Sequence, residues 1–565
     1  MSSATPTSGT SPVRRLSLTG VLRLRRPSEI WFKPALSSVA AVAPPNLLLL
    51  ALGRLDLAMY TMAGSLCALY AHNRPYAARA RTLAWVVLGM IGGLAVALVT
   101  ASLTRDAVVL VTVGALLAAV QKALCDATRV GPPGNVVLTF ISSAALFVPQ
   151  SLGQIPGHLA LAAAAGVWAW LVGMAPAPVR PHGPERRATA QALNAAAAYA
   201  AAHGTGADED HAPARAAGYA AVQAAWPTLL ALPTTGARAA TRHALERLVV
   251  RAEVALAAPA DTDPERLRAW AHALRGAGRI PRTGDAPADT DELLGVDAEL
   301  AARPVPLWRR VGPLAPIAAR TALGCALAGY ASLALGIGRP YWALVTAAAL
   351  YQANLTLTWS RAVQRVVGNL AGVLLFAAIA PLAHLGQALL VLCCLALNFG
   401  AEALITRNYW LGSVCVTPMA LLVTEFAGYQ ATGDLMTERA VDTVVGALVG
   451  FLAAAVVVTN RRAGNRVEQA VTAADRARER AARLLAEPAP APGALEAARR
   501  GLAVALTDLR ATADGAAGEW WGRALPQERV VLAERSGHRT LAEAVRRQAV
   551  RPDRGAGTRT EDVRP

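Results

Sequence analysis

Two long apolar segments joined by a charged corner dominate the stretch from Ala319 to Asn369 of this 565-residue sequence. An α-helix rises about 1.5 Å per residue, so each segment is long enough to cross a hydrocarbon core of about 30 Å. The corner contains Gly338, Arg339 and Pro340, which interrupt a helix and place a fixed charge where lipid would not tolerate it. The pattern therefore predicts a tight transmembrane hairpin.

Further apolar segments of similar length occur before and after this hairpin. The hydrophobic content of 54% is too high for an ordinary soluble protein, yet long polar stretches separate and follow the apolar blocks. We therefore expect an all-α membrane protein of about twelve transmembrane helices. The segments lie near 34–52, 55–72, 83–103, 107–125, 135–153, 157–175, 315–336, 340–358, 366–384, 386–405, 409–428 and 440–459.

The two apolar blocks resemble one another in sequence. The Gly-Arg pair at 53–54 matches the pair at 338–339, and glycines four residues apart recur at 89–93 and 368–372. Glycines at this spacing let two membrane helices approach closely, and internal repeats are common in transporters. We interpret the blocks as two parallel six-helix repeats, each followed by a cytosolic helical region.

Basic residues at the segment ends predict the orientation of the chain. Positively charged loops remain in the cytoplasm, which places both termini and both polar regions inside the cell, with the blocks in the plasma membrane. No cleavable signal peptide is evident, so the first membrane helix acts as the signal. The loops assigned to the inside carry Arg74, Arg79, Arg81, Lys122, Arg129, Arg361, Arg365 and Arg407.

Five regions follow from this organisation. We expect a basic N-terminal tail over 1–31, held at an anionic membrane face, and a C-terminal region whose last dozen residues are disordered. The regions are 1–31, a first membrane block at 32–175, a cytosolic helical domain at 176–312, a second membrane block at 313–459 and a cytosolic helical region at 460–565.

Enzyme motifs are absent from the sequence. It contains no phosphate-binding glycine loop with Lys and Ser/Thr, no GxSxG and no His/Glu metal motif. The six cysteines lie in apolar stretches without metal-type spacing, as small core residues do. We therefore expect no enzymatic activity, no cofactor and no metal. Many of the arginines that give the net charge of +17 lie next to apolar runs, so the charge indicates the orientation in the membrane rather than nucleic-acid binding.

Charged residues within or beside membrane helices are costly against lipid, so they should face an interior or a watery path. Arg361 and Arg365 are four residues apart on one helix face and either collect anions or snorkel as orientation signals. Arg439 and Asp442 form either a structural ion pair or a proton-responsive coupling site. Glu402, a lone acid on an apolar helix, is a further candidate for the substrate path.

Uncharged polar and aromatic residues add to the candidate path. Tyr341 and Trp342 fall at the expected outer interface, where they form an aromatic belt or line an exit for planar substrates. Thr346, Asn354 and Asn369 offer hydrogen-bonding groups toward the centre of the bundle, for helix packing or for substrate contact.

Three strings carry a family resemblance: GRPYWALVTAAALYQANLTLTWSRAVQRVVGNLAG, RNYWLGSVCVTPMALLV and RAVDTVVGALVG. They resemble the signature segments of the fusaric acid resistance (FUSC) and aromatic acid exporter family, strongly over 315–459 and more weakly over 32–175. The resemblance implies a two-times-six-helix inner-membrane protein with cytosolic domains, associated with efflux of aromatic carboxylic acids. Its motif positions hold Arg339, Tyr341, Trp342, Arg361, Arg365, Gly368, Arg407, Tyr409, Thr417, Pro418, Arg439, Asp442 and Gly446.

The leading hypothesis is a secondary exporter of small organic anions, aromatic acids in particular. Its partners are the lipid bilayer and the substrate, a homo-oligomer is left open, and no nucleic acid is involved. Export of an anion from a negative-inside cell is favoured by about 2.3 kcal/mol per charge per 100 mV. An anion channel and a membrane-anchored scaffold with cytosolic helical bundles are the alternatives.

Overall fold

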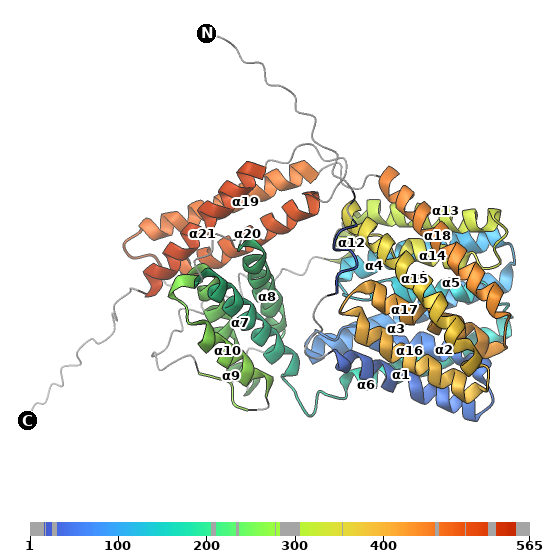
Figure 1. The fold of residues 1–565 in the computed structure, drawn as a ribbon. Helices are drawn as coiled ribbons and strands as arrows, with labels where there is room; N and C mark the ends of the chain where they lie inside the picture. Colours follow the sequence, from blue (N-terminus) through green and yellow to red (C-terminus); the bar gives the residue numbers. More distant parts are fainter. Residues whose placement is uncertain are drawn as a thin grey trace, which may run out of the picture. The chain divides into compact units, whose positions relative to one another are not determined.

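The computed structural model describes residues 16, 18–24, 31–204, 211–232, 237–276, 278–282, 306–352, 354–457, 463–491, 493–517 and 527–549. All regular elements in these ranges are helices (Figure 1), so the all-α class is confirmed for this part of the chain. The expectations for residues 1–15 and for the last dozen residues lie outside the described residues.

The chain divides into two compact units. The first, called here the membrane unit, comprises the described residues within Met1–Val179 and Pro304–Arg461. The second comprises those within Arg180–Arg303, Arg462–Ala517 and Gly522–Pro565. The units divide at 179/180, 303/304 and 461/462, whereas the sequence predicted boundaries at 175, 312 and 459.

The membrane unit contains both apolar blocks. Its helices are α1 (Phe32–Ala51), α2 (Ala58–Ser65), α3 (Tyr76–Leu103), α4 (Ala107–Thr128), α5 (Val136–Leu146), α6 (Ile155–Met174), α12 (Leu307–Val311), α13 (Ala315–Ala334), α14 (Tyr341–Ala348), α15 (Leu355–Ala383), α16 (Gln387–Ile405), α17 (Tyr409–Thr424) and α18 (Thr432–Val456).

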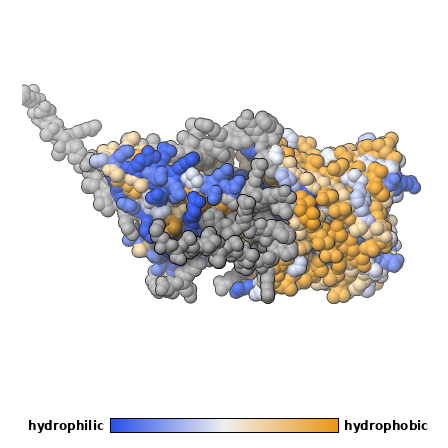
Figure 2. Space-filling model, turned by 90° about the horizontal axis from the view of Figure 1, so that it is seen from above, coloured by the Kyte–Doolittle hydropathy of each residue, from blue (hydrophilic) through white to orange (hydrophobic). Residues whose placement is uncertain are grey.

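Length and composition make this unit a membrane-spanning one. Among the described residues, nine helices are long and apolar enough to cross a bilayer. Large hydrophobic side chains such as Trp85, Leu103 and Leu374 are exposed on their outer faces, and Figure 2 shows a largely hydrophobic surface over this unit. Such a surface is stable against lipid and not against water.

The second arm of the predicted hairpin is shorter than the sequence suggests. Helix α14 has eight residues, all of them buried, and rises about 12 Å. The helix ends at Ala348, and a new one, α15, begins after Asn354, whose Oδ1 accepts a hydrogen bond from the amide of Leu357 at 2.9 Å. The apolar run at 340–358 is therefore not a membrane-spanning helix. Protein surrounds it where the hydropathy pattern implied lipid.

The first block contains a similar short helix. Helix α2 also has eight residues, and seven of them are buried. Helix α5 is likewise too short to span a bilayer alone. All twelve predicted segments thus contain helix, but α2, α5 and α14 do not reach transmembrane length in the described part of the chain.

Helices of the two blocks pack in matching pairs. Helix α1 packs against α16 of the second block, and α13 packs against α4 of the first. Within the blocks, α2 packs on α6 and α14 packs on α18. Both of these contacts depend on glycine. A Cβ at Gly64 would lie 2.2 Å from the carbonyl oxygen of Ala162, and one at Gly446 would lie 2.4 Å from that of Ala343.

The two polar regions form one helical unit. A buried pair joins them: Arg499 Nη2 of α20 lies 3.1 Å from Glu253 Oε2 of α9, while Trp226 Nε1 donates to Glu253 Oε1 at 2.7 Å. The sequence indicated two separate helical regions; the structure joins them through a shared core. The helices are α7 (Gly183–Gly204), α8 (Ala212–Leu230), α9 (Ala237–Ala257), α10 (Pro264–Arg275), α19 (Ala463–Ala486), α20 (Ala494–Ala517) and α21 (Gln527–Ala549).

Candidate functional site

A cavity of about 1780 Å³ lies inside the membrane unit. Its lining comes from α2, α4 and α5 of the first block and from α13 to α18 of the second. On α17 the lining residues run from Tyr409 to Thr424, a rise of about 24 Å. The cavity exceeds the roughly 300–1,000 Å³ of a small-ligand pocket and extends along most of a membrane helix.

Basic side chains predominate in the lining, which has eight of them against three acidic ones. Two of the acids already have partners: Lys122 lies 2.8 Å from Asp126, and Arg54 lies 3.1 Å from Asp56. A cavity with low-dielectric walls and excess positive charge attracts anions. The basic residues are Arg23, Lys122, Arg129, Arg339, Arg361, Arg365, Arg407 and Arg439; the acidic ones are Asp56, Asp126 and Glu402.

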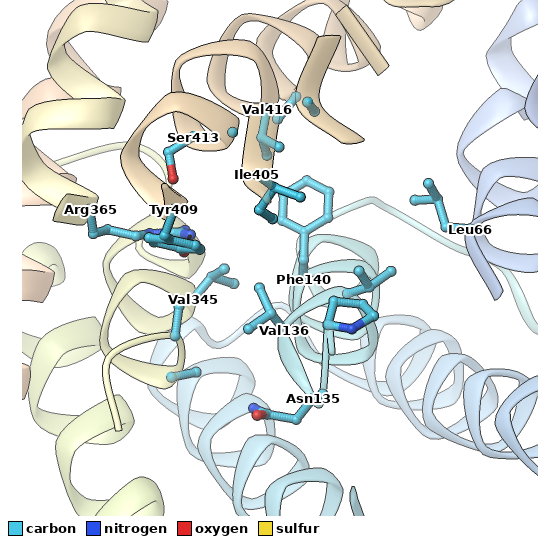
Figure 3. A pocket seen from close by; sticks show the side chains of 18 of the residues that line it. Leu66, Asn135, Val136, Phe140, Val345, Arg365, Ile405, Tyr409, Ser413 and Val416 are labelled. Carbon is cyan, nitrogen blue, oxygen red and sulfur yellow. Dashed lines mark hydrogen bonds between the residues drawn. The ribbon is translucent and has the colours of Figure 1, made fainter. Parts of the chain in front are cut away.

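Arg361 and Arg365 both line the cavity, and both contact Tyr409 at the start of α17. The guanidinium carbon of Arg361 lies 3.9 Å from the centre of the Tyr409 ring. Arg365 Nη1 donates to Tyr409 Oη at 2.7 Å, as the neighbouring side chains in Figure 3 illustrate. We call these three residues the tyrosine cluster.

The burial of Arg365 bears on the two interpretations of this arginine pair. Arg365 is 5% exposed, and its Nε has no hydrogen-bond partner among the described residues. A snorkelling orientation signal would extend its charge into water. The position of Arg365 instead favours the anion-collecting interpretation.

Arg439 is a second buried arginine in the lining. It is 2% exposed, and its guanidinium carbon lies 4.1 Å from the centre of the Trp342 ring. Its Nε and Nη1 have no hydrogen-bond partner in the part of the chain that the structure describes. A buried guanidinium with free donors is suited to bind a carboxylate.

The predicted ion pair between Arg439 and Asp442 is not formed. Both residues are described, and no charged atoms of the two approach within ion-pair distance. Arg439 extends over Trp342 of α14, whereas Asp442 Oδ1 accepts a hydrogen bond from Ser332 Oγ of α13 at 2.6 Å. The two side chains leave α18 toward different neighbouring helices and do not contact each other directly.

The aromatic belt expected at Tyr341 and Trp342 is also absent, because both side chains are buried. Tyr341 lines the cavity, with its ring centre 5.7 Å from that of Phe147. Trp342 lies beneath Arg439, outside the lining. Glu402 lines the cavity and makes no ion pair with any described residue.

Three uncharged polar candidates lie outside the lining. Asn354 caps the start of α15. Asn369 Nδ2 donates to Thr443 Oγ1 at 3.1 Å, and Asn369 Oδ1 accepts from Thr417 Oγ1 at 2.8 Å. Thr346 is fully buried where α14 meets α18. These hydrogen bonds give Asn354 and Asn369 a role in packing, whereas the hydroxyl of Thr346 has no hydrogen-bond partner among the described residues.

Sequence reasoning missed the contribution of the first block to this cavity. Figure 3 shows Phe140 and Val136 of α5 around the same space as Val345 and Ile405 of the second block. These apolar residues have no individual signature in the sequence. No cluster of His, Cys, Asp or Glu suited to a metal occurs among the described residues.

These observations define a multi-pass helical membrane protein with a basic cavity between its two blocks. Residues 326–453 match the family described as fusaric acid resistance protein-like, which confirms the resemblance over this segment. The uncharacterized membrane protein YvaC of Bacillus subtilis (strain 168) is 37% identical over 123 residues, which cover 21% of this chain and 19% of YvaC. The chain thus matches about a fifth of that relative's length. No solved structure matches it.

Proposed function

We propose that this protein is a secondary transporter that exports small organic anions, aromatic carboxylates in particular. The observation that carries the proposal is the pair of buried cavity arginines, Arg365 and Arg439, each with a guanidinium N–H that has no partner among the described residues. A buried donor without a partner costs about 1–3 kcal/mol, which the oxygens of a bound anion would offset. The match to the fusaric acid resistance-like family supports a role in efflux.

The walls of the cavity support a planar substrate. Tyr341 and Phe147 present rings to the lining close to Arg339, and Phe140 adds a further ring from α5. Aromatic side chains stack on planar rings, while an arginine binds the carboxylate. One cavity therefore offers both groups that an aromatic acid needs.

The proposed organisation is a duplication of six segments in the plasma membrane, with both termini in the cytoplasm. The matching helix pairs, α1 with α16 and α13 with α4, support the duplication. In this orientation the tyrosine cluster lies at the inner mouth, and the membrane potential favours export by about 2.3 kcal/mol per charge per 100 mV.

Asp442 is our candidate for coupling transport to protons. It is fully buried, and its Oδ2 has no hydrogen-bond partner among the described residues. It lies three residues from Arg439, so an anion bound at Arg439 would change the electrostatic potential at this carboxylate. An Asp442→Asn variant should still bind the anion, while its transport rate no longer depends on the proton gradient.

Transport by purified protein in proteoliposomes tests the main proposal. The Arg361→Ala/Arg365→Ala variant should export labelled benzoate at least about tenfold more slowly, because each lost charge-assisted contact is worth about 1.5–3 kcal/mol. Arg81→Ala/Arg105→Ala removes the same charge from exposed positions outside the lining and should transport normally. Wild-type benzoate export by a correctly folded Arg361→Ala/Arg365→Ala variant would contradict the proposal.

An anion channel is the second candidate, and the length of the cavity favours it, since the lining reaches both ends of α17. The two functions differ in their rates. Saturable benzoate flux supports a carrier, whereas discrete single-channel currents in a planar bilayer support a channel.

A further inference from the structure

A short segment of the N-terminal tail reaches the cavity. Residues 18–24, called here the N-terminal strap, form two tight turns, with Val21 N donating to Leu18 O and Arg23 N donating to Gly20 O. Thr19, Gly20, Val21 and Arg23 contribute to the cavity lining. The side chain of Val21 is 8% exposed, although the neighbouring leucines of the strap face outward. The strap is therefore seated on the unit and not merely adjacent to it.

Three side chains of the second block hold the strap by its backbone carbonyls. Gln364 Nε2 and Asn408 Nδ2 donate to Val21 O at 2.9 and 3.0 Å. Asn408 Nδ2 also donates to the carbonyl of Arg23 at 3.1 Å, and Trp410 Nε1 donates to that of Leu22 at 3.2 Å. All four hydrogen bonds end on main-chain oxygens, those of Val21, Leu22 and Arg23, so the three donors recognise the backbone of the strap and not its side chains.

The donors of this seat flank the tyrosine cluster. Gln364 directly precedes Arg365, and Asn408 and Trp410 lie on either side of Tyr409 in the sequence. A segment bound to these three donors covers the approach to Arg365 and Tyr409. On release, the strap would exchange these hydrogen bonds for bonds with water, and such an exchange has a small net free energy. The seat is thus suited to reversible closure.

We propose that the N-terminal strap is an autoinhibitory plug, which closes the arginine-lined mouth of the cavity and must leave before an anion reaches the tyrosine cluster. The identity of what is gated rests on the proposed function. The closure itself does not, because it concerns access of any solute to the cavity from this mouth.

Access to the cavity can be measured without transport. Val416 lines the cavity two turns beyond Tyr409 on α17 and is partly exposed, so Val416→Cys places a thiol behind the strap. The full-length protein in detergent is treated with a negatively charged methanethiosulfonate reagent. The labelling rate is corrected for the parent protein, which contains only the native cysteines.

Two substitutions that add the same charge distinguish the effect of unseating the strap from the effect of its added positive charge. Val21→Arg puts a cation into the buried seat beside Arg361 and Arg365, whereas Leu24→Arg puts it on a side chain that is already exposed. We expect Val21→Arg to raise the labelling rate of Val416→Cys about tenfold, as loss of a seat worth about 1.4 kcal/mol would. Leu24→Arg should leave the rate unchanged. Deletion of residues 2–24 should match Val21→Arg.

Equal labelling rates of Val416→Cys alone, with Val21→Arg and with the deletion of residues 2–24 would overturn the plug, and the strap would then be a fixed part of the wall. Benzoate flux in the same variants separates the two proposals. If labelling accelerates but no variant transports benzoate, the plug stands and the proposed function fails. If labelling and flux rise together, both are supported.

Discussion

Replacement of Arg439 by methionine should stabilise the protein and weaken anion binding at the same time. Methionine has an unbranched, flexible side chain that is shorter than that of arginine, with no charge and no donors. In the ligand-free protein the guanidinium is buried with Nε and Nη1 unpartnered, and each buried unpaired group costs about 1–3 kcal/mol. Removing the arginine relieves this cost.

Two favourable interactions are lost with Arg439, and they reduce the gain. The stack on Trp342, at 4.1 Å, contributes about 2 kcal/mol when desolvated. The nearby carboxylate of Asp442 also loses a stabilising positive charge. We therefore expect a net gain of about 1–2 kcal/mol in the free energy of unfolding, in line with replacements of buried ionic groups by apolar ones.

The effect on binding has the opposite sign. A charge-assisted hydrogen bond to a bound carboxylate contributes about 1.5–3 kcal/mol, so the Kd for benzoate should rise about 10- to 100-fold. Isothermal titration calorimetry in detergent measures this change. Thermal unfolding followed by tryptophan fluorescence, without ligand, should show a Tm that is higher by a few degrees.

A matched control distinguishes charge from geometry. Arg439→Lys keeps the charge but not the planar fork of donors, so its benzoate affinity should lie between those of the wild type and Arg439→Met. The reasoning is refuted if Arg439→Met lowers the Tm while benzoate affinity stays unchanged. Arg439 would then be a structural residue whose contacts matter more than its free donors.

Three further predictions concern packing and pH. Gly446→Val should sharply lower the yield of monodisperse protein in size-exclusion chromatography, because its Cβ would overlap the backbone of α14, whereas Gly433→Val on the same helix meets nothing within 4 Å. Asn369→Leu should cost about 1–3 kcal/mol of stability and leave benzoate affinity intact; a weaker affinity would restore Asn369 to the substrate path. In the second unit, burial lowers the pKa of His538 to about 3, so its neutral form is favoured in the fold and stability falls as the pH drops below about 6.5, by about 2 kcal/mol at pH 5. His538→Gln should remove most of the difference between the Tm at pH 7.5 and that at pH 5.

Hydropathy located the helices of the membrane unit because lipid imposes a strong compositional constraint on long helices. The same pattern gave a wrong prediction of a transmembrane helix at 340–358, because α14 is buried by protein. An apolar run has the same composition whether protein or lipid surrounds it. Helix α15 begins at Leu355, well before the predicted 366. The prediction was late because the first turns contain Ser360, Arg361 and Arg365, and a pattern based on apolar content does not detect turns with polar residues.

The candidate site was predictable where a single helix carries the signal. Arg361 and Arg365 share a face by their spacing, and the structure places both on the cavity. The contacts of Arg439 and Asp442 were not predictable, because Trp342 and Ser332, which they contact, lie on two other helices. Spacing along one helix cannot indicate which neighbour a long side chain reaches.

The packing of α1 of the first block against α16 of the second affects the order in which the protein assembles during synthesis. Helix α1 is among the first segments to leave the ribosome, yet its native neighbour α16 begins only at Gln387. At about 5–20 residues per second, α1 waits on the order of tens of seconds in the bilayer before its mate is synthesised. During that interval Ser38, which is buried in the finished protein, lacks its hydrogen-bond partner Asn398 of α16. The hydrogen bond between Ser38 and Asn398 can therefore form only after α16 has been made.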